Sequence, residues 1–433
     1  MTKLELHWQI LIAIVMAGIA GGTINYLIAN GVENPGFFGV SAIAVLDYIG
    51  TIFLNALKMI IVPLIFSSIT VGVAGIGSGG NLGSLGGKTL LFYLATTIAA
   101  ILVGLLLVNL IGPGYIDGQP VGDMLGLDAD SSQIALAAES RGPGDVAQIF
   151  KNMVPPNVVQ AAAQGQMLGI IFFALLFGYF MTQMDNALSE PMYRFWDGVF
   201  NIMMLMTEWI MKFAPIGVFG LVGKVVAEAG FSGVGPLAVF ALTVVAALAV
   251  HALVVLPLFL RYLGNVSPYK MFPAMAPAML TAFSTASSSA TLPVTMNCVE
   301  DNAGVSNKIS SFVLPLGATV NMNGTALYEC AAAMFLAQAY GLDLTISVQF
   351  SIVVIALLTS VGVAGVPSAS LVAIAIILGA VGLPLEAVGV LLVFDRILDM
   401  MRTSLNIFGD SCCAVIVARM SGEETKLALD AKN

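Results

Sequence analysis

Charged and amide side chains recur every three or four residues near the carboxyl end of the chain, in a segment that is otherwise apolar. At about 100° per residue, this spacing places them within an arc of roughly 80° on one face of a helix. Carboxylates interleaved with a guanidinium and an amide suit a zwitterionic or anionic ligand together with small cations. The residues on this face are Asp395, Asp399, Arg402, Asn406 and Asp410, with Thr403 at its edge.

The side chains on this face offer distinct chemistries. The planar guanidinium of Arg402 matches a carboxylate, and Asp399, one turn away, can take an ammonium group. Asn406 and Asp410 supply the oxygens that a small cation prefers. A charge at mid-membrane costs about 2.5–3.5 kcal/mol even on a lenient insertion scale, so this concentration of charge indicates a function. The structural alternatives are a salt-bridge ladder that only joins helices and a helix mouth among lipid headgroups.

A second polar cluster lies upstream, where Asn321 and Asn323 flank a methionine and Gly324 follows. This pattern predicts a helix break within the membrane that frees carbonyl groups for ion binding. A glycine kink in a buried helix is the structural alternative. Glu329 lies in the next apolar stretch, where a buried carboxyl with no cation beside it can carry a proton.

The elements that must position these residues are membrane helices. The 433-residue chain is 58% hydrophobic and 9% charged, against about 25% charged in soluble proteins, and its mean hydropathy is +0.97. Its net charge of −9 argues against nucleic acid as a partner. The four cysteines lack a Cys-x-x-Cys spacing and the two histidines cannot form a clustered zinc site, so the cysteines are expected to pack helices.

Apolar runs long enough for a bilayer, which needs about 20 residues, recur along the chain. The first has no basic stretch before it, which predicts a retained membrane helix and not a signal peptide. The acidic, glycine- and proline-containing segment 113–152 is predicted to be a solvated loop. Lys and Arg near the helix ends place both termini in the cytoplasm. The apolar runs are 8–30, 45–76, 89–112, 166–184, 199–222, 236–263, 309–337 and 386–418.

Two further segments, 269–296 and 347–380, are apolar but interrupted by serine, threonine, glycine and proline. Each half is too short to cross a membrane alone, which predicts a re-entrant hairpin that enters, turns and returns. Irregular backbone at that depth is tolerated only where it is buried in protein or lines a cavity. A kinked spanning helix is the alternative for either segment. Paired interrupted segments of this kind indicate the binding site of a transporter.

Four ordered motifs resemble those of the glutamate transporter family, the dicarboxylate/amino acid:cation symporters that include the excitatory amino-acid transporters. The resemblance extends over essentially the whole chain. The motifs are Ser287–Thr295, Asn321–Thr325, Gly365-Val366-Pro367 and Asp399–Asn406.

This resemblance implies an all-α membrane protein of eight transmembrane helices and two re-entrant hairpins, arranged as inverted repeats. It also implies a homotrimer of elevator transporters in the cell or inner membrane, with lipid around it. A scaffold formed by about 1–80 and 113–227 would hold a moving transport domain formed by about 87–112 and 233–420. Sodium would be the coupling ion, with no organic cofactor.

The resemblance also implies roles for individual residues. Arg402 would hold the side-chain carboxylate of the substrate and Asp399 its amino group. Ser288, Thr325, Val366, Thr403 and Asn406 would complete the pocket. The implied sodium ligands are Gly317, Asn321, Asn406 and Asp410 at a first site, carbonyls of Thr319, Ser360, Val361 and Val363 at a second, and Tyr93, Thr96, Thr97, Asn321 and Asn323 at a third.

The chain departs from the family pattern at two positions. Asn323 stands where the family usually has aspartate, so the third sodium site is expected to be weaker, absent or altered. Ala286 stands where archaeal members carry an arginine, and Arg396, which with Asp395 lies near the binding residues, is expected to replace that guanidinium from the opposite wall. Glu329 matches a glutamate that animal members use in proton coupling, so it is the candidate for proton transport.

The predicted function is symport of acidic amino acids, aspartate or glutamate, with sodium and protons. A C4-dicarboxylate carrier of the same fold has no ammonium for Asp399, and a neutral amino-acid carrier leaves Arg402 without a partner. A membrane serine hydrolase lacks both a nucleophile elbow and a base, since His251 lies in an apolar helix. We therefore expect no enzymatic activity. The C4-dicarboxylate carrier and the neutral amino-acid carrier remain the alternatives within this fold, and a passive ion channel is likewise disfavoured.

Overall fold

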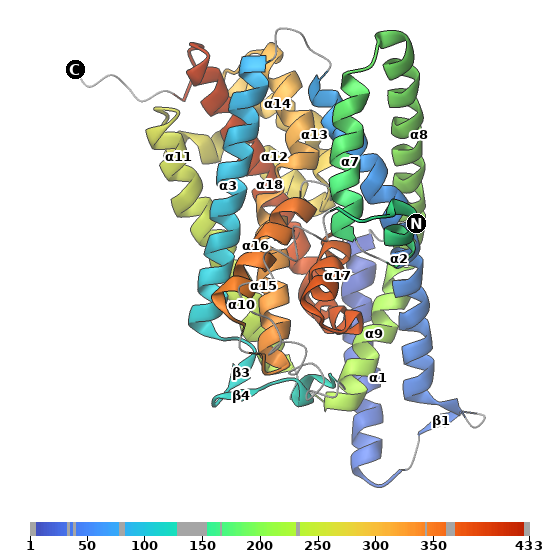
Figure 1. Ribbon diagram of the computed structural model, residues 1–433. Helices are drawn as coiled ribbons and strands as arrows, with labels where there is room; N and C mark the ends of the chain where they lie inside the picture. The colour runs from blue at the N-terminus through green and yellow to red at the C-terminus, as the bar shows by residue number, and fades with distance from the viewer. Residues whose placement is uncertain are drawn as a thin grey trace, which may run out of the picture.

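Helices form nearly all of the regular structure in the described part of the chain, apart from two short two-stranded ribbons. The computed structural model (Figure 1) describes residues 6–32, 35–37, 40–77, 83–127, 154–164, 167–230, 234–342, 344–360 and 369–427. The sequence prediction of an all-α protein therefore agrees with the structure at the level of its secondary structure.

One group of packed helices consists of α1, α2, α7, α8 and α9. Helix α1 lies along α9, and α2 packs against α7, α8 and α9 (Figure 1). Small residues permit the close approach of α1 and α9, because a Cβ added at Gly21 would lie 2.5 Å from the carbonyl oxygen of Gly223. The bounds of these helices are Leu6–Ala29 for α1, Ala42–Gly77 for α2, Met167–Thr182 for α7, Asn186–Met211 for α8 and Ala214–Ala229 for α9.

A second group forms around α15, in which every residue is buried. Helices α3, α10, α16, α17 and α18 all pack against it. Its alanine-rich sequence gives a smooth surface that several neighbours can approach closely. The bounds are Gly83–Ile111 for α3, Val234–Val250 for α10, Asn307–Val320 for α14, Asn323–Ala339 for α15, Ile346–Ser360 for α16, Ala369–Val381 for α17 and Val388–Met420 for α18.

Three helical stretches among the described residues are long and apolar enough to cross a membrane: Trp8–Ala29, Leu85–Ile111 and Val234–Tyr262. The run 199–222 is not one span, and the prediction of a single helix there is wrong. Helix α8 ends at Met211 and α9 begins at Ala214, with Pro215 in its first turn. Proline has no backbone N–H and is suited to the first turn of a helix, which favours a new start there.

The predicted break in the run 309–337 is present. Helix α14 ends at Val320 and α15 begins at Asn323, so Asn321 and Met322 connect them. Two close approaches require glycine at this break. A Cβ at Gly317 would lie 2.5 Å from Asp410 Oδ1, and one at Gly324 would lie 2.8 Å from the carbonyl oxygen of Arg402.

The two interrupted segments each form a pair of contacting helices. In the first, Pro268–Thr285 (α12) and Ser288–Asn297 (α13) are joined by Ala286, which has a left-handed φ of 49°. Ser287 caps α13 by accepting a hydrogen bond from the Ala290 amide. In the second, Ile346–Ser360 (α16) and Ala369–Val381 (α17) pack on each other and on α15, and the connecting residues 361–368 lie outside the described part.

The remaining elements are short or continue a helix already given. Residues His251–Val255 (η3) and Cys298–Asn302 (η4) are π-helical turns that extend α10 and α13. The predicted loop 113–152 begins with a β-ribbon, and 128–152 lies outside the described residues. These elements are β1 Gly36–Phe37, β2 Val40–Ser41, β3 Tyr115–Ile116, β4 Gln119–Pro120, η1 Asp123–Leu125, α6 Val158–Ala163, α11 Leu256–Tyr262 and η5 Leu385–Ala387.

Candidate binding site

The polar face of α18 is buried along its whole length. Arg402 has no exposed surface, and the exposed fractions of the other four residues on this face are between 1% and 6%. Burial of so many polar groups in one helix requires that they pair with each other, with neighbouring helices or with a ligand. The other four are Asp395, Asp399, Asn406 and Asp410.

Arg402 is held by two carboxylates of its own helix and by an aromatic ring. Its Nη2 donates to Asp395 Oδ1 at 3.0 Å and to Asp399 Oδ1 at 2.9 Å. Its Cζ lies 3.7 Å from the centroid of the Tyr328 ring, which is a close cation–π contact. These contacts orient the guanidinium before any ligand arrives.

Two donors of the same guanidinium remain available. Nε and Nη1 of Arg402 are buried and have no hydrogen-bond partner among the described residues. A guanidinium has donors only, so these positions can be satisfied only by acceptor oxygens. A carboxylate oxygen placed at either position would supply one of the missing hydrogen bonds, and these bonds to a charged acceptor are among the stronger ones.

Asn406 connects α18 to the beginning of α15. The Gly324 amide donates to Asn406 Oδ1 at 2.8 Å, and Asn406 Nδ2 donates to Thr325 Oγ1 at 3.1 Å. Thr403, one turn before it, donates its hydroxyl to the carbonyl oxygen of Asp399 at 2.8 Å. The structure therefore brings Thr325, Thr403 and Asn406 to the same region as the two arginine-binding carboxylates.

A network of amides and hydroxyls surrounds Asp410. Asn321 Nδ2 donates to Asp410 Oδ1 at 2.8 Å, and Thr96 Oγ1 donates to Asn321 Oδ1 at 3.4 Å. Thr97 Oγ1 donates to Asn323 Oδ1 at 2.8 Å. The single oxygen of the Asn323 amide is thus already engaged, and its Nδ2 has no partner among the described residues.

Tyr93 lies beside this network without joining it through its hydroxyl. Its OH donates to the carbonyl oxygen of Val313 at 2.7 Å. Thr319 and Ser360 each donate their hydroxyls within their own helices, to Leu316 and Leu357. The carbonyls proposed for sodium at Val361 and Val363, and the pocket residue Val366, lie outside the described residues.

Glu329 joins α15 to α16. Its Oε2 accepts a hydrogen bond from Thr359 Oγ1 at 2.9 Å, while its buried Oε1 has no partner among the described residues. No part of Glu329 is exposed. A carboxyl with one free buried oxygen can hold a proton there as a neutral acid.

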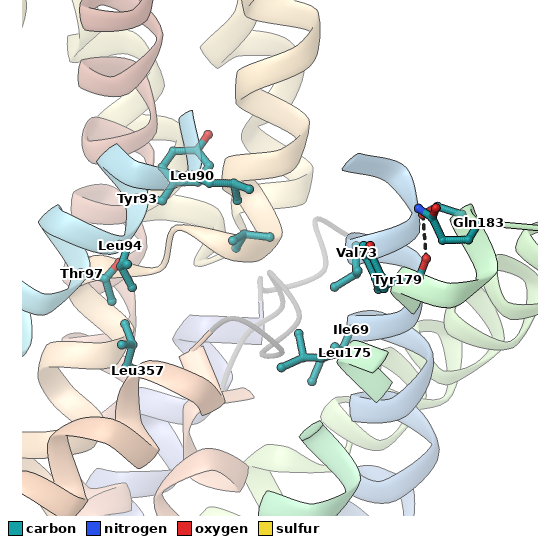
Figure 2. A pocket seen from close by; sticks show the side chains of 13 residues that line it. Ile69, Val73, Leu90, Tyr93, Leu94, Thr97, Leu175, Tyr179, Gln183 and Leu357 are labelled. Atoms are coloured by element: carbon teal, nitrogen blue, oxygen red, sulfur yellow. Dashed lines mark hydrogen bonds between the residues drawn. The ribbon is translucent and has the colours of Figure 1, made fainter. Parts of the chain in front are cut away.

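A cavity of about 560 Å³ lies between the two helix groups. Figure 2 shows Ile69 and Val73 of α2 and Leu175 and Tyr179 of α7 facing residues of α3 across it. Its lining is mostly apolar, but Tyr93 and Thr97 also face it. The cavity therefore reaches the edge of the amide network and not the arginine.

Two contact residues, Tyr328 and Thr359, were not among the residues predicted from the sequence. Tyr328 is fully buried under Arg402, and Thr359 is the partner of Glu329. Tyr328 is a large polar aromatic residue in an alanine-rich apolar stretch, which is the only sequence feature that distinguishes it. Ser288, which was predicted, is buried in the first turn of α13.

Comparison with known proteins adds independent information. The sodium:dicarboxylate symporter family model matches residues 6–420. The chain is 37% identical to the proton/sodium-glutamate symport protein of Geobacillus stearothermophilus over 98% of this chain and 96% of that relative. It is 35% identical to the proton/glutamate-aspartate symporter of Escherichia coli (strain K12) over 96% and 93%. It is 33% identical to excitatory amino acid transporter 3 of Mus musculus over 96% and 86%.

Proposed function

Because this chain belongs to the sodium:dicarboxylate symporter family, we propose that it is a membrane symporter that moves aspartate or glutamate together with sodium ions and protons. Two of these relatives are named as symporters of glutamate or of glutamate and aspartate, and they align over nearly the whole chain. Such a protein is a transporter and not an enzyme.

The observation that carries this proposal is the geometry of Arg402. Its guanidinium is fully buried, is oriented by Asp395 and Asp399, and keeps Nε and Nη1 without partners in the described residues. The side-chain carboxylate of an acidic amino acid supplies the acceptors that these donors lack. Asp399 then takes the ammonium group, and Ser288, Thr325, Val366, Thr403 and Asn406 complete the pocket.

We assign the coupling ions to the oxygen-rich regions around this pocket. A first sodium ion uses Gly317, Asn321, Asn406 and Asp410, and the Asn321–Asp410 hydrogen bond supports this proximity. A second uses carbonyls at Thr319, Ser360, Val361 and Val363. The third site of the family, around Tyr93, Thr96, Thr97, Asn321 and Asn323, is weakened here because the Asn323 amide brings no charge.

We assign the proton to Glu329. Its carboxyl is buried, is bonded by a single hydroxyl, and lies on α15, the helix that also supplies Tyr328 and Thr325. Protonation would make this carboxyl neutral, and a change in that proton during the transport cycle would couple the cycle to pH. With the third sodium site weakened, we propose reduced sodium coupling together with proton coupling.

We further propose an elevator transporter with eight transmembrane helices, two re-entrant hairpins and inverted repeats, assembled as a homotrimer in the cell membrane with both termini cytoplasmic. The packing of α1, α2, α7, α8 and α9 as one group supports the division into a scaffold and a transport domain. The cavity between the two helix groups is lined mainly by apolar side chains. We propose that the transport domain slides past the scaffold along these apolar walls.

Uptake into liposomes tests the proposed function. Purified protein is reconstituted, and uptake of aspartate, glutamate, succinate, serine and alanine is measured with and without inward sodium and proton gradients. We expect concentrative uptake of aspartate or glutamate that stops when an ionophore removes the gradients. Uptake that does not depend on the sodium and proton gradients would indicate a channel. A preference for succinate would indicate a dicarboxylate carrier.

A further inference from the structure

Arg396 is a second buried guanidinium on α18. The residue is 5% exposed, and its Nε and Nη1 have no hydrogen-bond partner among the described residues. The nearest opposite charge is Asp399, whose Oδ2 lies 3.8 Å from Nη1, which is beyond hydrogen-bond distance. Unsatisfied buried donors are uncommon in folded proteins, so two on one side chain require an explanation.

The two arginines bracket one carboxylate. Asp399 Oδ1 accepts from Arg402 Nη2 at 2.9 Å, while its Oδ2 faces Arg396. With Asp395, the four charges of this cluster cancel, yet Nε and Nη1 of each guanidinium form no hydrogen bond within the described residues. These are four nitrogen atoms, whereas one ligand carboxylate has two oxygens. A ligand with two carboxylates and one ammonium can satisfy both arginines and Asp399.

Arg396 lies at the level of the turn between α12 and α13. Helix α12 runs antiparallel to α18. Ser404 Oγ donates to the Met279 carbonyl at 3.1 Å, and the Ser267 amide, just before α12, donates at 3.0 Å to the carbonyl of Leu427, which follows the end of α18. At about 1.5 Å per residue, Ala286 lies roughly 10 Å beyond Met279, and Arg396 lies roughly 12 Å beyond Ser404 in the same direction.

This level also holds the beginning of α13. Ala286 contributes only a methyl group there, and Ser288 in the first turn of α13 is buried. Helix α13 contacts α18. An anionic group between Arg396 and the first turn of α13 would therefore meet a guanidinium on one side and backbone N–H groups on the other.

We propose that Arg396 is a second carboxylate-binding residue of the pocket, which takes the α-carboxylate of the substrate while Arg402 takes the side-chain carboxylate. This assignment rests on the proposed function and deepens it, since it makes the site selective for ligands with two carboxylates. A site built to hydrogen-bond two charged groups rejects analogues that lack either, because buried donors are then left unpaired.

Two monoamides of aspartate separate the roles of the arginines. Asparagine lacks the side-chain carboxylate, and aspartic acid α-amide lacks the α-carboxylate. Binding of aspartate and both amides is measured with full-length protein in nanodiscs at saturating sodium, for the wild type, Arg396→Gln and Arg402→Gln. Arg194→Gln is the matched control, because Arg194 pairs with Glu190 on the exposed face of α8.

The expected result is a crossed pattern. The wild type and Arg194→Gln prefer aspartate over each amide by more than about tenfold, the size expected for loss of a charge-assisted pair. Arg396→Gln loses its preference over the α-amide and keeps its preference over asparagine. Arg402→Gln shows the reverse.

Three results would contradict these proposals. An Arg396→Gln protein with the wild-type ratio of aspartate to α-amide affinity overturns the assignment, even though the proposed function stands. A wild type that binds aspartate and its α-amide equally overturns it without any variant, which covers the case of a variant that does not fold. A wild type that binds no acidic amino acid rejects the proposed function itself.

Discussion

The two halves of the polar face of α18 differ in how completely they are paired. In the first half, Asp395, Asp399 and Arg402 form ion pairs but leave two donors of Arg402 without partners in the described residues. In the second half, Asn406 accepts a hydrogen bond from the backbone amide of Gly324 on α15. Asp410 accepts one from the side-chain amide of Asn321, at the break between α14 and α15. Among the described residues, the first half therefore keeps unpaired donors, whereas the hydrogen bonds of the second half are largely made within the protein.

The difference follows from the functional groups. An amide has both donors and acceptors, so amides and hydroxyls can satisfy one another in a neutral network. A guanidinium has donors only, in a rigid planar arrangement, and needs acceptor oxygens on each edge. Under the proposed function, the unpaired donors of the first half bind the substrate carboxylate, and a cation at the second half must compete with hydrogen bonds that already engage its oxygens.

Among the substitutions considered, the largest effect on substrate binding is expected in the first half of the face, at Arg402. Arg402→Cys removes the fork and leaves Asp395 and Asp399 without their shared partner. Loss of such a pair costs about 2–5 kcal/mol, so aspartate and glutamate affinity should fall well over tenfold, with a gain of neutral substrates such as serine or alanine. Competition against labelled aspartate in proteoliposomes measures this. Unchanged affinity for acidic substrates would refute the role of Arg402.

In the second half of the face, Asp410→Asn should weaken sodium binding. The substitution keeps the shape but removes the charge that accepts from Asn321. Hydrogen bonds to charged groups contribute about 1.5–3 kcal/mol, so the sodium concentration for half-maximal aspartate binding should rise about tenfold or more. A sodium titration measures it, with Asp47→Asn on the exposed surface as the control. A sodium curve that matches the control would contradict this assignment.

Asn323→Asp should add a charge to the amide network that surrounds Asp410. The new carboxylate adds charge next to Thr97, where the present amide is neutral. We expect the variant to move more sodium per substrate than the wild type, because a carboxylate attracts a cation far more strongly in a low dielectric. Reversal potentials in proteoliposomes count sodium ions and protons separately. Equal sodium counts in both proteins would mean that Asn323 coordinates sodium as well as aspartate does.

Glu329→Gln tests whether a proton belongs to the cycle. The amide oxygen can still accept from Thr359, so the packing of α15 on α16 should persist. We expect the reversal potential of the wild type to shift with an imposed proton gradient and that of the variant to stay unchanged. Reversal potentials at two external pH values provide the measurement. A variant that keeps the full pH response would move the proton to another group.

The smallest effect is expected for Thr97→Val. This nearly isosteric change removes the hydroxyl that donates to Asn323 and leaves the amide unpaired. A lost hydrogen bond costs about 1 kcal/mol, which should appear as a slightly lower thermal midpoint and a small change in sodium dependence. Thr182→Val, whose hydroxyl bonds within exposed α7, is the control. A change as large as that of Asp410→Asn would show that Thr97 binds the cation directly.

The helical class of the protein and the position of several of its helices are predictable from the sequence by itself. Composition indicates a membrane protein, and the length of the apolar runs locates long helices such as α3 and α10. The charged face of α18 could be drawn from residue spacing, and the break at Asn321 from its glycine and amides. The division between α8 and α9 was missed because the apolar character continues through Lys212 and only Pro215 marks the new start.

Only the tertiary structure decided which atoms are paired. Spacing along α18 could not show that Tyr328 lies under Arg402, that Thr359 bonds Glu329, or that Thr97 engages Asn323. Each of these contacts joins residues that are distant in sequence, on helices whose relative rotation depends on the packing of many apolar side chains. Periodicity gives the face on which a residue lies, but the position of its neighbours comes from that packing, because hydrogen bonds form only at specific distances and angles.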